Sequence, residues 1–196
     1  MSGWDISGWE IAGFLLGVVG VVLMIRQHLL AWPVGLVQVA IYAWVFYGAR
    51  LYSDAILQVI FFVLLMYGWV QWRRGVREGQ VRHDLPVTSL TLSGKLICLG
   101  IGAVATGAWG EFMRRNTDAA LPHWDAFILA FSMVAQWMQA RKKIENWALW
   151  MAVNVVAIGV YFTKQLYLTA ILYAVFLGLA VAGRVTWQRH WVRNMP

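Results

Sequence analysis

The sequence contains a single cysteine, Cys98, and only 13% of its residues are charged. One cysteine excludes an internal disulfide and a cysteine-based metal centre. The charged fraction is about half of that in an ordinary soluble domain. None of the nine acidic residues lies in the middle of an apolar run, where a proton or sodium relay would need a carboxylate. These shortages argue against a disulfide scaffold and against an ion-coupled pump, and they favour a passive facilitator.

The sequence also lacks the motifs of common enzymes. It has no glycine-rich phosphate loop, no nucleophile elbow and no HExxH zinc motif. The four histidines lie between apolar runs and show no metal-ligand spacing. We therefore expect neither enzymatic activity nor a cofactor nor a bound metal. The formal charge of +7 could indicate a nucleic-acid partner, but the positive residues lie in short loops rather than along one stripe, so none is expected.

Apolar residues dominate instead, at 61% of the chain with a mean hydropathy of +0.62. A chain of this size cannot hide so much apolar surface in a core of its own, so its natural surroundings are a lipid bilayer. We predict an all-α integral membrane protein with seven transmembrane helices. The expected spans are 9–26, 33–49, 53–72, 89–110, 124–140, 146–163 and 167–187. Tryptophans near the span ends, Trp32, Trp72, Trp187 and Trp191, are interpreted as residues of the aromatic interface belt.

An internal repeat organises these spans. Shifting the chain by 115 residues aligns 9–72 with 124–187 without a gap, and about fifteen of the 64 positions are identical. The matched pairs include Trp32 with Trp147, Trp72 with Trp187, and Gly68 with Gly183, glycines that are expected to allow close helix approach. Three helices reverse the direction of the chain and one further helix restores it. The sequence therefore predicts two parallel three-helix repeats, 9–72 and 124–187, joined by a linker helix at 89–110.

The positive residues predict the orientation of the chain in the membrane. With the N-terminus (1–8) outside, the cytoplasmic loop 73–88, the other inner loops and the tail 188–196 hold most of the arginines and lysines, whereas the outer loops, including 111–123, hold few. The inner set is Arg26, Arg73, Arg74, Arg77, Arg82, Arg141, Lys142, Lys143, Arg184, Arg189 and Arg193, against Arg50, Arg114, Arg115 and Lys164 outside. Lys95 can extend back to the inner face. In the polar stretch 73–88 we expect a loop with one amphipathic turn.

Uncharged polar and aromatic side chains within the spans are the candidate site residues. Such groups are costly in lipid unless they pair or face a cavity. Trp147, Trp150 and Asn154 are spaced three and four apart, which places them on one helix face. Gln58 and Tyr173 occupy equivalent positions of the two repeats, and Gln136 lies in the fifth span beside the further candidates Ser132 and Gln139. Hydrogen bonding between helices is the alternative role for Gln58, Gln136 and Tyr173.

These residue types indicate a class of ligand. Aromatic faces attract a cationic ring, and amides pair with hydroxyls or with a carboxamide. A phosphorylated ligand would find no cation in the middle of the membrane. The sequence therefore predicts a small flat vitamin or a nucleoside as substrate, rather than an ion or a lipid.

Several segments together resemble the PnuC family of bacterial vitamin transporters. They are Trp32-Pro33-Val34-Gly35, the run from Leu51 to Gln58, the run Glu145-Asn146-Trp147-Ala148-Leu149-Trp150 with its WxxW element, and the run from Tyr167 to Tyr173. The resemblance covers roughly 9–187. It implies a fold similar to the SWEET transporters, commonly as a homotrimer, in the bacterial inner membrane. It also implies uptake of nicotinamide riboside by facilitated diffusion, with cytosolic phosphorylation trapping the product.

The same resemblance assigns substrate contacts to Trp147, Trp150 and Asn154, and by a looser match to Gln58, Gln136 and Tyr173. Related members of the family take thiamine or riboflavin, so another vitamin is the first alternative. The presence of both tryptophans of the WxxW element favours nicotinamide riboside. The second alternative is a membrane-embedded binding subunit that needs a separate ATPase.

Overall fold

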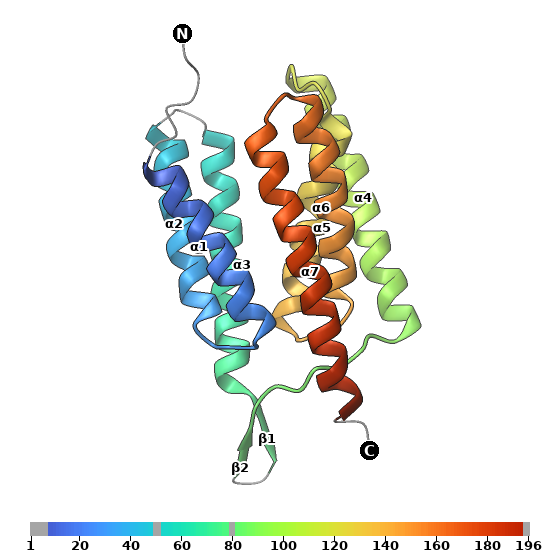
Figure 1. The fold of residues 1–196 in the computed structure, drawn as a ribbon. Helices are drawn as coiled ribbons and strands as arrows, with labels where there is room; N and C mark the ends of the chain where they lie inside the picture. The colour runs from blue at the N-terminus through green and yellow to red at the C-terminus, as the bar shows by residue number, and fades with distance from the viewer. Residues whose placement is uncertain (1–7, 49–51, 79–80, 194–196) are drawn as a thin grey trace. The chain divides into compact units, whose positions relative to one another are not determined.

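The structure, a computed structural model, describes residues 8–48, 52–78 and 81–193 and contains seven helices within these ranges (Figure 1). They are α1 (Gly8–Ile25), α2 (Ala31–Gly48), α3 (Tyr52–Arg74), α4 (Leu92–Asn116), α5 (Pro122–Ala140), α6 (Asn146–Thr163) and α7 (Tyr167–Arg193). Each helix coincides with one predicted span to within a few residues at most ends, which confirms the all-helical prediction. The linker helix α4 and α7 extend about six residues beyond the predicted ends. Most of the expected outer N-terminus (1–7) and the end of the tail (194–196) lie outside the described residues.

A short β-hairpin occupies the predicted polar loop. Strands β1 (Val76–Glu78) and β2 (Val81–His83) pair antiparallel, with Val76 opposite His83 and Arg77 opposite Arg82. The expectation of an amphipathic turn in 73–88 is therefore wrong. Alternation of valine with arginine and other polar residues suits a two-stranded ribbon, in which successive side chains point to opposite faces.

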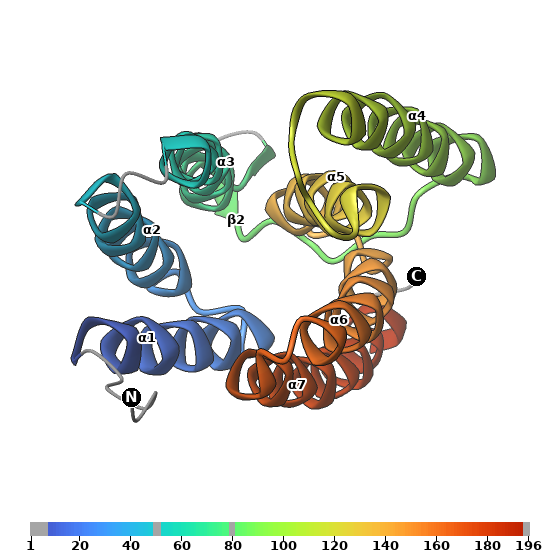
Figure 2. The ribbon, with the colours of Figure 1, turned by 90° about the horizontal axis from the view of Figure 1, so that it is seen from above.

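The chain divides into two compact units, Met1–His83 and Asp84–Pro196. In the first unit, α2 packs against both α1 and α3 (Figure 2). In the second unit, α5 packs against α4 and α6, and α6 packs in turn against α7. The linker helix α4 thus belongs to the second unit, where it lies beside the second three-helix repeat.

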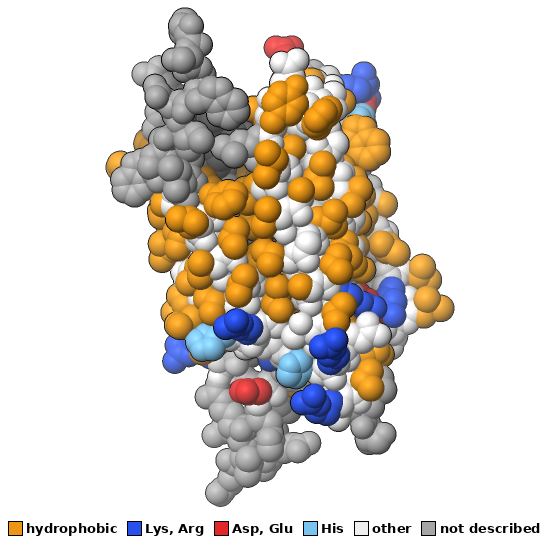
Figure 3. All heavy atoms as spheres, viewed as in Figure 1, with side chains coloured by type: hydrophobic (Ala, Val, Ile, Leu, Met, Phe, Trp, Pro, Cys, Tyr) orange, Lys and Arg blue, Asp and Glu red, His pale blue; other side chains and the backbone are white. Residues whose placement is uncertain are grey.

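Apolar side chains cover the outside of the helices. Among the described residues, three helical stretches are long and apolar enough to cross a membrane, at Leu92–Asn116, Asn146–Thr163 and Thr169–Arg193, and two shorter apolar helices lie at Ala12–Ile25 and Ala31–Trp44. On the face seen in Figure 3, hydrophobic side chains spread over the length of the helices, and most of the arginines and lysines gather toward the end at which α7 finishes. A surface of this kind is expected of helices that face lipid rather than water.

A cluster of two tryptophans and one glycine recurs at equivalent positions of both units. In the first unit, the rings of Trp32 on α2 and Trp72 on α3 meet edge to face, with centroids 5.3 Å apart and an angle of 80°. A Cβ atom added at Gly68 would lie 2.1 Å from the Trp32 ring. Only a glycine therefore leaves room for this indole.

The second unit repeats the cluster with Trp147 on α6 and with Trp187 and Gly183 on α7. The two rings are 5.4 Å apart at 87°, and a Cβ atom at Gly183 would lie 2.5 Å from the Trp147 ring. Trp32 and Trp187 are fully buried and Trp72 is 7% exposed. The interpretation of these three tryptophans as interface-belt residues is therefore wrong, because their rings lie between helices.

The turns of the repeat match as well. Gln27 and Lys142, which are 115 residues apart, both adopt the left-handed conformation, with φ of 54° and 48°. In both turns a backbone N–H reaches five residues back, from His28 to the Leu23 carbonyl and from Lys143 to the Met138 carbonyl. This is the Schellman ending of a helix, which uses carbonyls that the helix leaves unpaired. The two copies share their turns as well as their packing.

We predict that Gly183→Ala destabilises the protein by about 1–3 kcal/mol, because the added methyl group overlaps the Trp147 ring. The midpoint of thermal unfolding in detergent should fall. Gly178→Ala on the same helix is the matched control, because nothing lies within 4 Å of a Cβ atom there. Its midpoint should stay level or rise slightly, since alanine favours a helix over glycine. Equal midpoints for the two variants would contradict the tight fit of the indole on Gly183.

Candidate functional site

A buried polar stripe runs along α5. Ser132, Gln136 and Gln139 are spaced four and three apart, so their side chains lie on one face of the helix. They are 6%, 7% and 6% exposed. Buried amides and hydroxyls of this kind are normally hydrogen-bonded, so their partners reveal which groups are free for other contacts.

Helix α6 faces this stripe with Trp150. The indole Nε1–H of Trp150 donates to the Gln139 side-chain oxygen at 2.8 Å. Helices α5 and α6 are antiparallel neighbours joined by a short loop. Gln136 precedes Gln139 by three residues on α5, and Asn154 follows Trp150 by four residues on α6. Both therefore lie one turn farther from the loop than the Trp150–Gln139 contact, at the same level along the two helices. Asn154 is 4% exposed. The structure thus brings Trp150, Asn154 and Gln136 to one helix pair.

Gln136 carries an unused hydrogen-bond donor. Its side-chain nitrogen Nε2 is fully buried and has no partner among the described residues. Leaving a buried amide unpaired costs about 1–3 kcal/mol. A bound molecule that accepts from this nitrogen would recover that cost, so Gln136 is a candidate ligand contact within the buried stripe of α5.

Tyr173 is linked to the same helix face through Tyr161. Tyr161 follows Asn154 by seven residues, two turns along α6, and its ring stacks on that of Tyr173 from α7, with centroids 5.2 Å apart and an angle of 20°. Tyr173 also meets Phe176 edge to face at 6.1 Å. Sequence reasoning overlooked Tyr161, although its spacing from Asn154 is the spacing of a shared face. Gln139, the partner of Trp150, is among the further candidates that the sequence indicates.

Two predicted site residues lie elsewhere. Trp147 is 1% exposed and packs on Trp187 and Gly183 of α7, whereas Trp150 reaches α5. The two tryptophans of the WxxW element therefore face different neighbours. Gln58 is half-buried on α3 of the first unit. A substrate contact for either residue stays a prediction.

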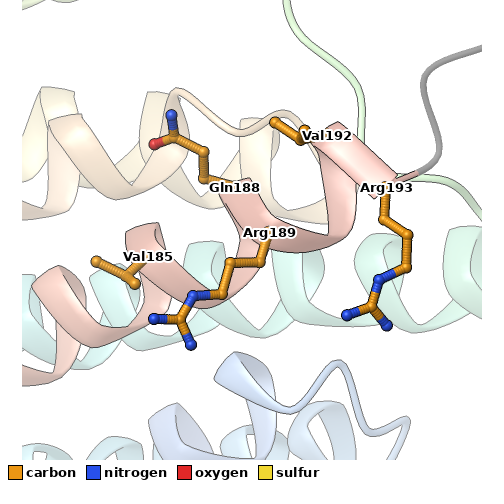
Figure 4. A pocket seen from close by; sticks show the side chains of 5 residues that line it. All are labelled: Val185, Gln188, Arg189, Val192 and Arg193. Atoms are coloured by element: carbon orange, nitrogen blue, oxygen red, sulfur yellow. The ribbon is translucent and has the colours of Figure 1, made fainter.

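A separate hollow lies at the C-terminal end of α7. Its described lining consists of Val185, Gln188, Arg189, Val192 and Arg193, with both arginines reaching out from the same helix (Figure 4). This lining contains no aromatic ring. It lacks the groups that hold a flat ring, and we do not place the site there.

An ion pair joins α5 and α6 at the end that lies away from the loop between them. Lys164, in the turn after α6, contacts both carboxylate oxygens of Asp125 at 2.8 Å. Asp125 lies in the first turn of α5, where a negative charge also favours the helix dipole. The pair ties the start of α5 to the end of α6, the two helices that carry the polar stripe.

Comparison with known proteins identifies the family. The family described as nicotinamide mononucleotide transporter matches residues 7–189. The nicotinamide riboside transporter PnuC of Escherichia coli (strain K12) is 25% identical, over 94% of this chain and 87% of the relative. The riboflavin/roseoflavin transporter RibM of Streptomyces davaonensis is 27% identical, over 93% of this chain and 84% of the relative. These matches confirm the predicted PnuC family and a transporter rather than an enzyme.

The fold also matches a solved structure. The crystal structure of the vitamin B3 transporter PnuC superposes with a TM-score of 0.77 at 23% sequence identity, over 98% of this chain and 85% of that chain. The seven-helix architecture is therefore that of a known transporter fold.

We predict that Gln139→Leu leaves the indole N–H of Trp150 without an acceptor and lowers the free energy of unfolding by about 1–3 kcal/mol. Trp150→Phe, which removes the N–H, should make the second change at Gln139 less costly. A double-mutant cycle on thermal or denaturant unfolding measures this coupling. Strictly additive effects would show that the 2.8 Å contact contributes nothing.

Proposed function

We propose that this chain, which belongs to the nicotinamide mononucleotide transporter family, takes up nicotinamide riboside across a bacterial inner membrane by facilitated diffusion. The observation that carries the proposal is the unpaired, buried side-chain nitrogen of Gln136, at the level of Asn154 and one turn from Trp150. A nucleoside with a carboxamide and ribose hydroxyls offers acceptors and donors for both amides.

The aromatic groups suit the charged ring of this ligand. The pyridinium of nicotinamide riboside carries a positive charge, and an indole face attracts such a ring by about 0.5–2 kcal/mol. Trp150 is only half-buried and its N–H is already bonded to Gln139, so its orientation is set before a ligand arrives. The stacked pair of Tyr161 and Tyr173 provides further aromatic surface from α6 and α7. No carboxylate is needed to balance the ring charge.

The distribution of charge supports facilitated diffusion. The helical acids Glu10, Asp54, Glu111 and Asp125 all lie near helix ends, where they cannot relay an ion through the middle of the membrane. Phosphorylation in the cytosol adds about two negative charges to the nucleoside. The polar side chains of the proposed site, Gln136, Gln139 and Asn154, are uncharged and offer such a group no cation, so the phosphorylated product would be trapped inside.

The membrane orientation follows from the positive residues. Arginines and lysines are concentrated in the loops that share a side with the C-terminus, including Arg141, Lys142 and Lys143. The positive-inside rule then places the N-terminus outside and the C-terminus in the cytoplasm.

Riboflavin is the second candidate substrate. The observation that favours it is the 27% identity to a riboflavin/roseoflavin transporter, which is similar to the identity to the nicotinamide riboside transporters. Riboflavin is flat and polar-edged but carries no cationic ring, so an aromatic face would hold it by stacking alone.

We predict that Trp150→Ala and Asn154→Ala each weaken binding of nicotinamide riboside by at least about 1 kcal/mol while the protein still folds. Isothermal titration of the purified chain measures the affinity, and thermal unfolding checks the fold. Trp109→Ala is the control, because this tryptophan lies on α4 and is 45% exposed. Normal affinity in both site variants would place the pocket elsewhere.

Uptake should require neither a partner protein nor an energy source. The purified chain in lipid vesicles should equilibrate nicotinamide riboside at a rate that is the same with and without a proton gradient or ATP. Strict dependence on either would contradict facilitated diffusion. Transport that appears only after an ATPase is added would support a binding subunit instead.

A further inference from the structure

The loop between α5 and α6 is fixed to the chain segment that leads into α4. The Thr88 N–H donates to the Lys142 carbonyl at 3.1 Å, and the Ile144 N–H donates to the Thr88 carbonyl at 2.9 Å. The Lys143 ammonium adds a bond to the Thr88 hydroxyl at 2.9 Å. Backbone and side chains therefore join segments that lie 55 residues apart in the sequence.

Glu145 is the centre of this junction. Its carboxylate accepts hydrogen bonds from the Ser89 hydroxyl and from the Leu90 N–H, and it pairs with Lys95 at 3.0 Å. The Glu145 side chain is 16% exposed. Burial alone would raise the pKa of Glu145, but the hydrogen bonds from Ser89, Lys95 and Leu90 outweigh it, so the pKa lies below the ordinary carboxyl value. The carboxylate is thus held charged by the first turn of α4 and its lead-in.

The first repeat forms the equivalent turn, between α1 and α2, without an acid at the position of Glu145. Its equivalent turn has the same left-handed residue, Gln27, and the same helix ending. The position that matches Glu145 is Leu30, a residue that is 55% exposed. The linker helix likewise has no counterpart in the first repeat. Glu145 therefore occurs in the repeat that packs against the linker helix α4, and its carboxylate contacts α4.

We infer that Glu145 is a positioning residue for substrate binding, acting through α6; this inference rests on the proposed function. Helix α6 begins at Asn146, directly after Glu145, and Trp150 follows within the next turn and a half. By anchoring the start of α6 to α4, Glu145 adds a restraint on the rotation at which Trp150 meets Gln139 on α5, beside the packing of Trp147 on Gly183. Arg184 of α7 supports the same loop by donating to the Ile144 carbonyl at 3.1 Å.

The test begins with Glu145→Ala and Glu145→Gln in the full chain. Glu145→Ala should raise the Kd for nicotinamide riboside about tenfold, the equivalent of one lost hydrogen bond to a charged group. Glu145→Gln keeps an acceptor for the Leu90 N–H but loses the charge that holds Lys95, so its Kd should lie between those of the wild type and the alanine variant. The control is Glu111→Gln, an acid near the other end of α4 whose partners among the described residues are its own helix neighbours Arg114 and Arg115. It should bind as the wild type does.

An engineered disulfide tests whether Glu145 acts by holding the α5–α6 loop against the segment that leads into α4. If it does, a covalent link between the two segments should restore the affinity that Glu145→Ala loses. Thr88 and Lys143 are bridge partners, so cysteines at both positions suit disulfide geometry. In a Cys98→Ala background, Thr88→Cys with Lys143→Cys and Glu145→Ala should regain nearly wild-type affinity when oxidised and lose it on reduction. The same cysteine pair with Glu145 retained should bind normally in both states.

Hydrogen exchange provides a readout that does not depend on the ligand. In Glu145→Ala, the amides of 88–92 and 145–150 should exchange faster, and the disulfide should slow them again. Unchanged affinity and unchanged exchange in both Glu145 variants would overturn the inference, and so would a weakened affinity that the oxidised disulfide fails to restore. If the wild-type chain does not bind nicotinamide riboside, the proposed function fails, while the exchange data still decide the role of Glu145 in holding α6.

Discussion

The contact between an indole and a glycine, present once in each unit, is the constraint on which the rest of the structure depends. Helices in lipid gain little from the hydrophobic effect, so close packing has to hold them together. The Trp147 ring occupies the space that a side chain at Gly183 would fill, and the same ring meets Trp187 edge to face. This contact fixes how α6 is rotated against α7. Trp150, three residues later, is thereby turned toward α5 and its bond with Gln139.

The duplicated scaffold carries a proposed site that is not duplicated. The positions that match Trp150 and Asn154 in the first repeat are Gly35 and Val39. Gly35 packs near the Leu65 side chain, at 3.2 Å from where its Cβ would be, so this position contributes packing and no polar group. The polar stripe of α5 and the pair of Trp150 and Asn154 on α6 occur in one copy only. A ligand with one charged ring and one sugar has no internal symmetry, and the proposed site, which draws on one of the two copies, suits such a ligand.

The sequence predicted the helices well because long apolar runs in lipid can satisfy their backbone only as helices. The repeat offset also predicted which tryptophans and glycines correspond. It did not predict that Trp32 and Trp187 are buried. Tryptophans of an interface belt occupy the same positions near the ends of apolar spans, and the sequence alone does not show which rings pack between helices. The hairpin β1–β2 was missed since its strands are only three residues long. The free nitrogen of Gln136 depends on which atoms surround it, and that information is not contained in any local pattern.

The central claim is that the α5–α6 face of the second unit recognises a cationic, carboxamide-bearing nucleoside. The most direct test is a side-by-side titration of the purified wild-type chain with nicotinamide riboside, thiamine and riboflavin. Nicotinamide riboside should bind most tightly, because it combines a cationic ring for the indole with acceptors for the Gln136 and Asn154 amides. Tighter binding of riboflavin or thiamine, or no binding of nicotinamide riboside, would contradict it.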